Sequence, residues 1–210
     1  MYDANFKILL FGDETEGKKT LTQKFMLKLF SEGHEDTIGV DFEVKSLSVE
    51  NYKIKLQMWD ISGEGRFRSF LPTYISYARG CLFVYDVTEK SSLTNINFWL
   101  NLVKEELTKE EPLPIIVVGI IPDSEKERQV SAEEGRRLAN LLELDGFVEC
   151  NIKSGENVEK MFEAISKLML ERSPPSTEPV ITKSSRKSRE NVLIGKQKRK
   201  KEKKKQKSEQ

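Results

Sequence analysis

A stretch near the N-terminus combines residue types that could hold a phosphate group. "GDETEGKKT" (12–20) follows the apolar run "FKILLF" (6–11). Gly12, Gly17 and Lys18 fit the pattern G-x-x-x-x-G-K-[ST], in which backbone N–H groups surround phosphate oxygens and a final hydroxyl binds Mg²⁺. Here Lys19 occupies the hydroxyl position and Thr20 comes one residue late. Neighbouring helix residues point about 100° apart, so Thr20 cannot replace the missing ligand. The stretch predicts a phosphate loop with a weakened Mg²⁺ site.

The elements that must position this loop alternate between strands and helices. Continuous apolar runs or period-two alternation predict strands at 6–11, 41–49, 52–60, 81–87, 114–119 and 146–150. Helical spacing follows the glycine loop from residue 18 to 30 and recurs at 90–108, 131–143 and 155–171. The two alternating strands, separated by "EN", predict an antiparallel hairpin. The whole pattern predicts an α/β fold with a mainly parallel sheet, in which the loops at 12–18, 60–65, 120–123 and 151–153 converge at one edge.

Charge divides the 210-residue chain into an acidic body and a basic C-terminal segment. Residues 183–210 carry 13 Lys+Arg and 3 Asp+Glu, so the remaining residues carry 22 and 31. We expect a domain over 1–172, a linker over 173–182 containing "SPPSTEP", and a disordered polybasic tail over 183–210. No apolar run is long enough to span a membrane, and "MYDANFK" lacks a signal-peptide pattern, so a cytoplasmic, non-secreted protein is expected. Cys81 and Cys150 lie in apolar segments and are expected to be buried free thiols rather than a disulfide or metal site.

Several separated motifs, in order, resemble the Ras superfamily and within it the Rab proteins. They are "TIGVDF" (37–42), "KLQMWDISGEGRFRSF" (55–70), "VYDVTEKSS" (84–92), "FWLNLV" (98–103) and "KSGENVEKMF" (153–162). The resemblance runs over about residues 5 to 170. It implies a P-loop small G-domain with a six-stranded, mostly parallel sheet, one antiparallel strand and helices on both faces.

The resemblance also implies a site for GTP or GDP with Mg²⁺. Lys18 would reach the β- and γ-phosphates, Thr37 and Asp60 would hold the metal, and Gly63 would contact the γ-phosphate. Asp123 would bind the guanine edge, and the N–H of Ile152 would face guanine O6. The implied nucleotide-binding residues are Gly12, Asp13, Glu14, Thr15, Glu16, Gly17, Lys18, Lys19, Thr20, Thr37, Asp60, Gly63, Asp123, Asn151, Ile152 and Lys153, and the implied catalytic residue is Glu64.

An aromatic set is implied by the same resemblance. Phe42, Trp59 and Tyr74 match the triad that Rab proteins present to effectors. Ordinary core packing is the alternative explanation for these three side chains. Effector or regulator proteins are therefore expected partners, and the chain itself is expected to be a monomer.

Departures from the family pattern affect the phosphates, the attacking water and the base. Glu14 and Glu16 would place negative charge beside the phosphates. Glu64 replaces a glutamine that orients water, which alters hydrolysis. "GIIPD" (119–123) puts Ile120 where the family has an asparagine that ties this loop to the phosphate loop, and we see no replacement for its hydrogen bonds. "CNIK" (150–153) keeps the lysine and offers Asn151 as a hydrogen-bond partner for Asp123.

Three functions remain open on the sequence alone. The motif frame favours a Rab-like guanine-nucleotide switch with impaired Mg²⁺-dependent hydrolysis. The degraded motifs favour a pseudo-GTPase that works as a protein-interaction module. Nucleic-acid binding through the tail is weaker, because the tail lacks aromatic residues that stack on bases. The chain ends "KKKQKSEQ" without a prenylation signal, so the tail predicts either reversible contact with an anionic membrane or a purely solubilising role.

Overall fold

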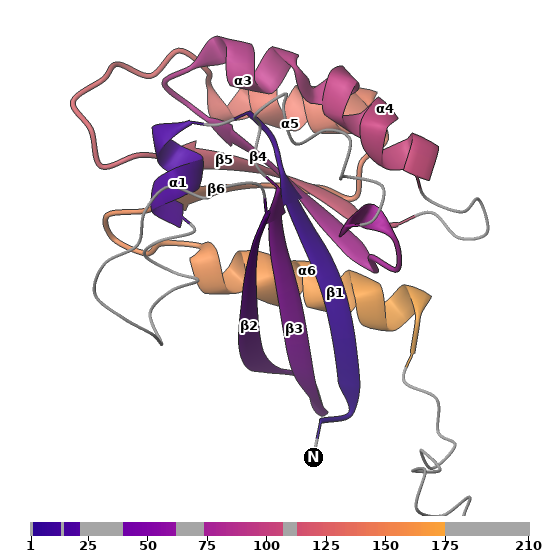
Figure 1. Ribbon diagram of the computed structural model, residues 1–210. Helices are drawn as coiled ribbons and strands as arrows, with labels where there is room; N and C mark the ends of the chain where they lie inside the picture. Colours follow the sequence, from indigo (N-terminus) through magenta and orange to yellow (C-terminus); the bar gives the residue numbers. More distant parts are fainter. Residues whose placement is uncertain (1, 14, 22–39, 62–73, 107–112, 175–210) are drawn as a thin grey trace, which may run out of the picture. The chain divides into compact units, whose positions relative to one another are not determined.

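The computed structural model describes residues 2–13, 15–21, 40–61, 74–106 and 113–174. These residues build a six-stranded sheet in the order β2-β3-β1-β4-β5-β6 (Figure 1). β2 and β3 are antiparallel, and every other neighbouring pair is parallel. The predicted fold class and the predicted hairpin are therefore confirmed. The strands are β1 Ala4–Phe11, β2 Val40–Val49, β3 Tyr52–Ile61, β4 Gly80–Asp86, β5 Ile115–Ile121 and β6 Gly146–Asn151.

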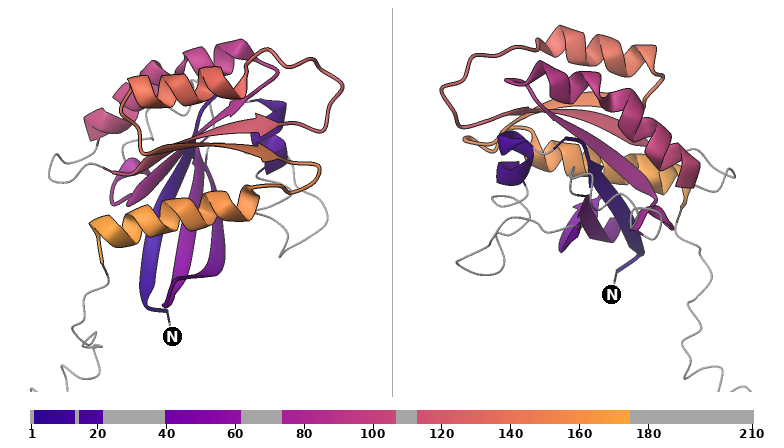
Figure 2. Two further views of the ribbon diagram at one scale, coloured as in Figure 1. Left: turned by 180° about the vertical axis from the view of Figure 1, so that it is seen from behind. Right: turned by 45° about the horizontal axis from the view of Figure 1, so that its top comes forward.

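Helices cover both faces of the sheet. α6 lies on one face, and α3, α4 and α5 lie on the other (Figures 1 and 2). Successive residues of a strand point to opposite faces, so β1 serves both apolar cores. Ile8 and Leu10 join the core under α6, whereas Leu9 and Phe11 join the core under α3, α4 and α5. The helices are α1 Glu16–Leu21, α3 Lys90–Thr94, α4 Ile96–Glu106, α5 Ala132–Leu141 and α6 Val158–Arg172.

Two helices begin and pack as the sequence predicts. Ser131 caps α5 through a capping box with Glu134, in which each side chain accepts the other residue's backbone N–H. The predicted face of α6 is fully buried and consists of Val158, Phe162, Ile165 and Met169. The i, i+4, i+7, i+11 spacing thus identified the surface that α6 packs against the sheet.

The helical pattern over 90–108 is observed as two helices that are separated at Asn95, and residues 107 and 108 lie outside the described part of the chain. α3 ends at Thr94 and α4 begins at Ile96. The Asn95 carbonyl accepts the Trp99 N–H, and its side-chain amide donates to Asp13 in the glycine loop. The residue between the two helices thus contacts a loop that is distant in the sequence.

Cys81 and Cys150 are buried free thiols, as predicted. Burial raises the pKa of both, that of Cys150 to about 12. Within the described part of the chain, no helix is both long and apolar enough to cross a bilayer. The predicted tail and most of the predicted linker fall outside the described residues, so their boundaries stay predictions.

Candidate nucleotide site

The glycine loop follows the end of β1, which pairs with β4, and leads directly into α1. Gly12 has φ +144, and a Cβ there would lie 2.1 Å from the Val84 carbonyl oxygen, so the position accepts only glycine. The order strand, glycine loop, helix places the loop at the carboxyl edge of the parallel strands (Figure 1). This is the context that a phosphate loop requires.

Lys18 is held inside the protein by the end of β3. Its ammonium Nζ lies 2.8 Å from Asp60 Oδ1 and donates to the Ile61 carbonyl oxygen at 2.6 Å. Lys18 is 1% exposed and Asp60 is 4% exposed. β3 runs parallel beside β1, which brings Asp60 level with the start of the loop. The lysine predicted to reach phosphate thus neutralises the carboxylate predicted to hold Mg²⁺.

Two loop amides that were predicted to face phosphate have acceptors within the protein. The Gly17 N–H donates to Asp86 Oδ2 at 3.0 Å. The Lys18 N–H donates to the hydroxyl oxygen of buried Thr15 at 3.2 Å. In both contacts, a protein oxygen accepts the hydrogen bond that phosphate was predicted to accept.

Asp86 contacts the glycine loop and was not among the site residues that the sequence analysis predicted. It is the last residue of β4 and is fully buried. Thr88 donates to its Oδ1 from both the backbone N–H (2.8 Å) and the hydroxyl (2.7 Å). The signal was present as "DVT", an aspartate two residues before a threonine at the end of an apolar strand, which is typical of an Asx turn.

Ile120 stands where the family has the asparagine that ties this loop to the phosphate loop. Ile120 is fully buried beside Asp86 in the β4–β5 register. A Cβ on Gly17 would lie 2.7 Å from Asp86 Oδ2 and 2.9 Å from Ile120 Cγ2. Asp86 therefore anchors the loop from the neighbouring strand, and Ile120 only packs against it.

Asp13 ties the loop to the break between α3 and α4. Its two carboxylate oxygens accept hydrogen bonds from the Asn95 amide at 2.6 Å and the Trp99 indole N–H at 2.8 Å. The side chain of Asp13, a predicted nucleotide-binding residue, thus holds the glycine loop against α4 and the residue before it.

The base end of the site differs from the predicted arrangement in two contacts. The N–H of Ile152 donates to the Ile121 carbonyl at 3.1 Å rather than standing open for guanine O6. Asn151, which we expected to bond Asp123, instead accepts from the Ser154 N–H at 3.0 Å because the chain turns tightly after β6. Asp123 does lie in this region, where Lys153 Nζ approaches its carboxylate at 2.9 Å. This hydrogen bond and the charge of Asp123 raise the pKa of Lys153.

The predicted aromatic triad forms a cluster of tilted rings. Ring centroids are 4.9 Å apart for Phe42 and Trp59 and 5.6 Å apart for Trp59 and Tyr74. Phe42 of β2 is 46% exposed, so the cluster reaches the surface instead of lying wholly in the core. Its role toward effectors stays a prediction.

Six of the predicted site residues cannot be placed in full. Glu14, Thr37, Gly63 and Glu64 lie outside the described residues, and the side chains of Glu16 and Lys19 are likewise not described. Asp60 is a suitable Mg²⁺ ligand by chemistry but is paired with Lys18. Among the described residues, no group of three or more His, Cys, Asp or Glu side chains is placed to hold a metal. Of the two predicted Mg²⁺ ligands, Asp60 is therefore described and Thr37 is not.

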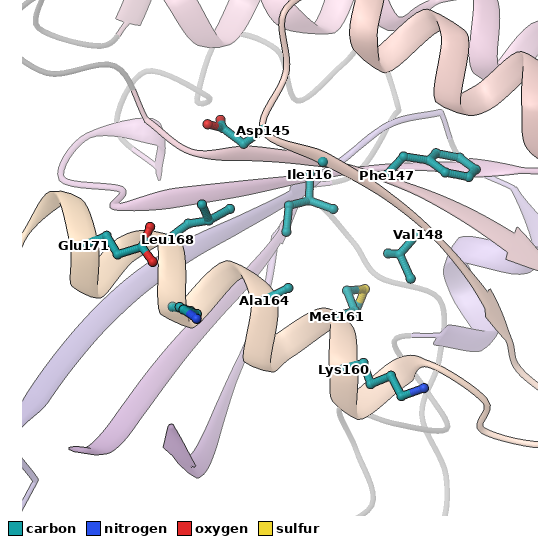
Figure 3. Close-up of a pocket in the computed structure, with 11 residues that line it drawn as sticks. Ile116, Asp145, Phe147, Val148, Lys160, Met161, Ala164, Leu168 and Glu171 are labelled. Atoms are coloured by element: carbon teal, nitrogen blue, oxygen red, sulfur yellow. The ribbon is translucent and has the colours of Figure 1, made fainter. Parts of the chain in front are cut away.

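A separate hollow of about 500 Å³ lies between β6 and α6 (Figure 3). Ile116, Val148, Ala164 and Leu168 give it apolar walls, and Lys160 stands at its edge. It contains none of the predicted nucleotide-binding residues.

Comparison with known proteins gives consistent results over the whole described domain. The model of the Ras family matches residues 7–171. Ras-related protein SEC4 of Saccharomyces cerevisiae is 38% identical over 171 residues, which cover 81% of this chain and 78% of the relative. Ras-related protein Rab-1 of Theileria parva is 37% identical, covering 87% and 83%, and Ras-related protein Rab-26 of Homo sapiens is 40% identical, covering 82% and 66%. The chain therefore belongs to the Ras family of small GTPases and is Rab-like within it.

Proposed function

We propose that this Rab-like switch binds guanine nucleotide at "GDETEGKKT" with little dependence on Mg²⁺ and hydrolyses GTP slowly. The observation that carries the proposal is the buried pair between Lys18 and Asp60. An internal ammonium already balances the carboxylate that would otherwise attract the metal. Lys19, which replaces the hydroxyl ligand, adds a further positive charge by its residue type.

Slow hydrolysis follows from the residues at two further positions. When bound, Mg²⁺ neutralises the charge that develops between the β- and γ-phosphates. The carboxylate of Glu14 would repel the negative charge that develops on the phosphates. Glu64 can accept a proton from water but cannot donate a hydrogen bond to the transferred phosphoryl group. Both residues act against turnover more than against binding, because the backbone donors of the loop do not depend on them.

Nucleotide affinity with and without metal tests this proposal. Purified full-length protein and Lys19→Thr should be titrated with GDP, GTP and ATP, in Mg²⁺ and in EDTA. The wild type should bind guanine nucleotide about equally in both buffers, and Lys19→Thr should gain Mg²⁺ dependence. Turnover of Lys19→Thr should stay slow because Glu14 and Glu64 remain. Loss of nucleotide from the wild type in EDTA would contradict the proposal.

A second candidate is a pseudo-GTPase that serves as a protein-interaction module. It is supported by the internal partners of the Gly17 and Lys18 amides, which satisfy the loop without a ligand. The same titration separates the two. A folded wild-type protein that binds neither GDP nor GTP in either buffer is a pseudo-GTPase.

Regulators or effectors would contact the aromatic cluster of Phe42, Trp59 and Tyr74, because its exposed member, Phe42, lies on the hairpin. The basic segment 183–210 would add reversible attachment to an anionic membrane surface, at about 1 kcal/mol per basic residue close to the lipid. This combination describes a monomeric cytoplasmic switch with peripheral membrane contact.

A further inference from the structure

We propose that Asp86 sets the nucleotide affinity of this protein by competing with phosphate for the Gly17 N–H. The inference rests on the proposed binding of nucleotide at the glycine loop. It identifies an internal carboxylate, outside the loop sequence, as the group that an incoming phosphate must replace.

The structure places the carboxylate of Asp86 against the glycine loop, at the end of the neighbouring strand β4. Asp86 ends β4, beside α1 and opposite Ile120 of β5 (Figure 1). Its Oδ2 accepts the Gly17 N–H at 3.0 Å, and its Oδ1 accepts two donors of Thr88. The carboxylate is fully buried, so water cannot take over any of these bonds.

The charge of Asp86 is balanced by dipoles alone within the described residues. Its contacts there are three hydrogen-bond donors, and no lysine or arginine of that part of the chain forms an ion pair with it. The nearby ammonium of Lys18 is directed to Asp60. A buried negative charge that is stabilised by hydrogen bonds alone repels a second anion, and it occupies one amide that the anion needs.

The residues on both sides favour the hydrogen bond between Gly17 and Asp86. Any side chain at Gly17 would collide with Asp86 Oδ2 and Ile120 Cγ2. Ile120 offers no polar group, so the hydrogen-bonded anchor of the loop on this side is Asp86. The tightness of the packing keeps the carboxylate in place when the loop has no other acceptor.

Asp86→Asn separates the carboxylate's two roles with almost no change of shape. The asparagine oxygen can keep two bonds by facing Thr88 or one bond by facing Gly17. Keeping two bonds is favoured, which leaves the Gly17 N–H available and removes the charge. Asp145→Asn is the matched control, because Asp145 Oδ2 accepts the Ile115 N–H at 2.8 Å at the opposite edge of the sheet.

The test measures GDP affinity of wild type, Asp86→Asn and Asp145→Asn in EDTA, together with hydrogen exchange of the Gly17 amide by NMR in nucleotide-free wild type. Asp86→Asn should bind GDP about ten- to a hundredfold more tightly, the range expected for losing a hydrogen bond to a charged group. Asp145→Asn should match wild type. The Gly17 amide should be protected from exchange in the wild type.

The outcomes distinguish failure of this inference from failure of the proposed nucleotide binding. Measurable but equal affinities of wild type and Asp86→Asn, or weaker binding by Asp86→Asn, overturn the inference and leave the proposed function standing. Absence of binding by every variant overturns the proposed function and the role of Asp86 with it. Should Asp86→Asn not fold, a Gly17 amide that exchanges freely in the wild type overturns the inference, and a protected one supports it.

Discussion

Replacing Lys18 with methionine removes the ammonium that neutralises Asp60 while keeping a side chain of similar length. Asp60→Val removes the other partner, and Lys18→Met/Asp60→Val replaces the whole pair with apolar groups. We expect each single variant to lower the free energy of unfolding by about 3–5 kcal/mol and the double variant to lie within about 1 kcal/mol of wild type.

The magnitude follows from the burial of both partners. An exposed ion pair contributes about 0–1 kcal/mol because water screens it. Here the side chains of Lys18 and Asp60 are 1% and 5% exposed, so removing one partner leaves the other as an unpaired charge in the interior. The Ile61 carbonyl also loses its donor when Lys18 is replaced, which costs about 1 kcal/mol. The double variant has no unpaired charge, so it should recover most of the stability.

Urea unfolding followed by circular dichroism at 222 nm measures these differences. Lys167→Met is the matched control, because Lys167 pairs with Glu50 at 3.6 Å while more than half of each side chain is exposed. It should change the free energy of unfolding by less than about 1 kcal/mol. A cost below 1 kcal/mol for Lys18→Met, or single-variant costs that simply add in the double variant, would refute a buried Lys18–Asp60 pair.

Three further predictions concern the base site, the thiols and the tail. Asp123→Ala should abolish most preference for guanine over adenine nucleotides. Ile121 stands where the family has a lysine whose stem covers the base, and an isoleucine can also cover an apolar base face, so Ile121→Lys should change affinity only modestly. Equal binding of ATP and GTP by the wild type would refute a working guanine site. Burial raises the pKa of Cys150 to about 12 and that of Cys81 as well, so neither thiol should react with Ellman's reagent at pH 8 until the protein unfolds, and rapid labelling of the native protein would contradict this. Because an unfolded thiol ionises near pH 9.0 and these do not, their contribution to stability should be intact below that pH and decline above it. Deleting residues 180–210 should abolish salt-sensitive sedimentation with anionic vesicles, and undiminished binding by the truncated protein would argue against tail-mediated attachment.

Local patterns predicted most of the fold because they record burial directly. Alternation over 41–49 and 52–60 reflects strands with one apolar face, and both strands are observed with the predicted pairing. The break at Asn95 was not predictable in this way. The helical spacing continues across it, and the side chain of Asn95 bonds to Asp13, more than eighty residues earlier in the chain.

The sequence predicted which residues lie at the candidate site but not which groups they bond to. Motif spacing identified Lys18 and the resemblance to Rab proteins implied Asp60, and the sheet does bring them to one edge. The spacing of motif residues in the sequence does not indicate which acceptor a backbone N–H will bond to. The Gly17 amide selects Asp86, a residue that reads as the end of a strand, and the Ile152 amide selects a neighbouring carbonyl. Such choices depend on distances between separate strands, which only the folded chain defines.

The hydrogen bond from the Trp99 indole to Asp13 gives the glycine loop a built-in optical reporter. Indole emission depends on the polarity and hydrogen bonding around its N–H, and this N–H ends on a carboxylate of the loop itself. The chain contains two tryptophans, so replacing Trp59 with phenylalanine leaves Trp99 as the sole source of tryptophan fluorescence. Movements of the loop can then be followed in real time without attaching a dye or modifying a nucleotide.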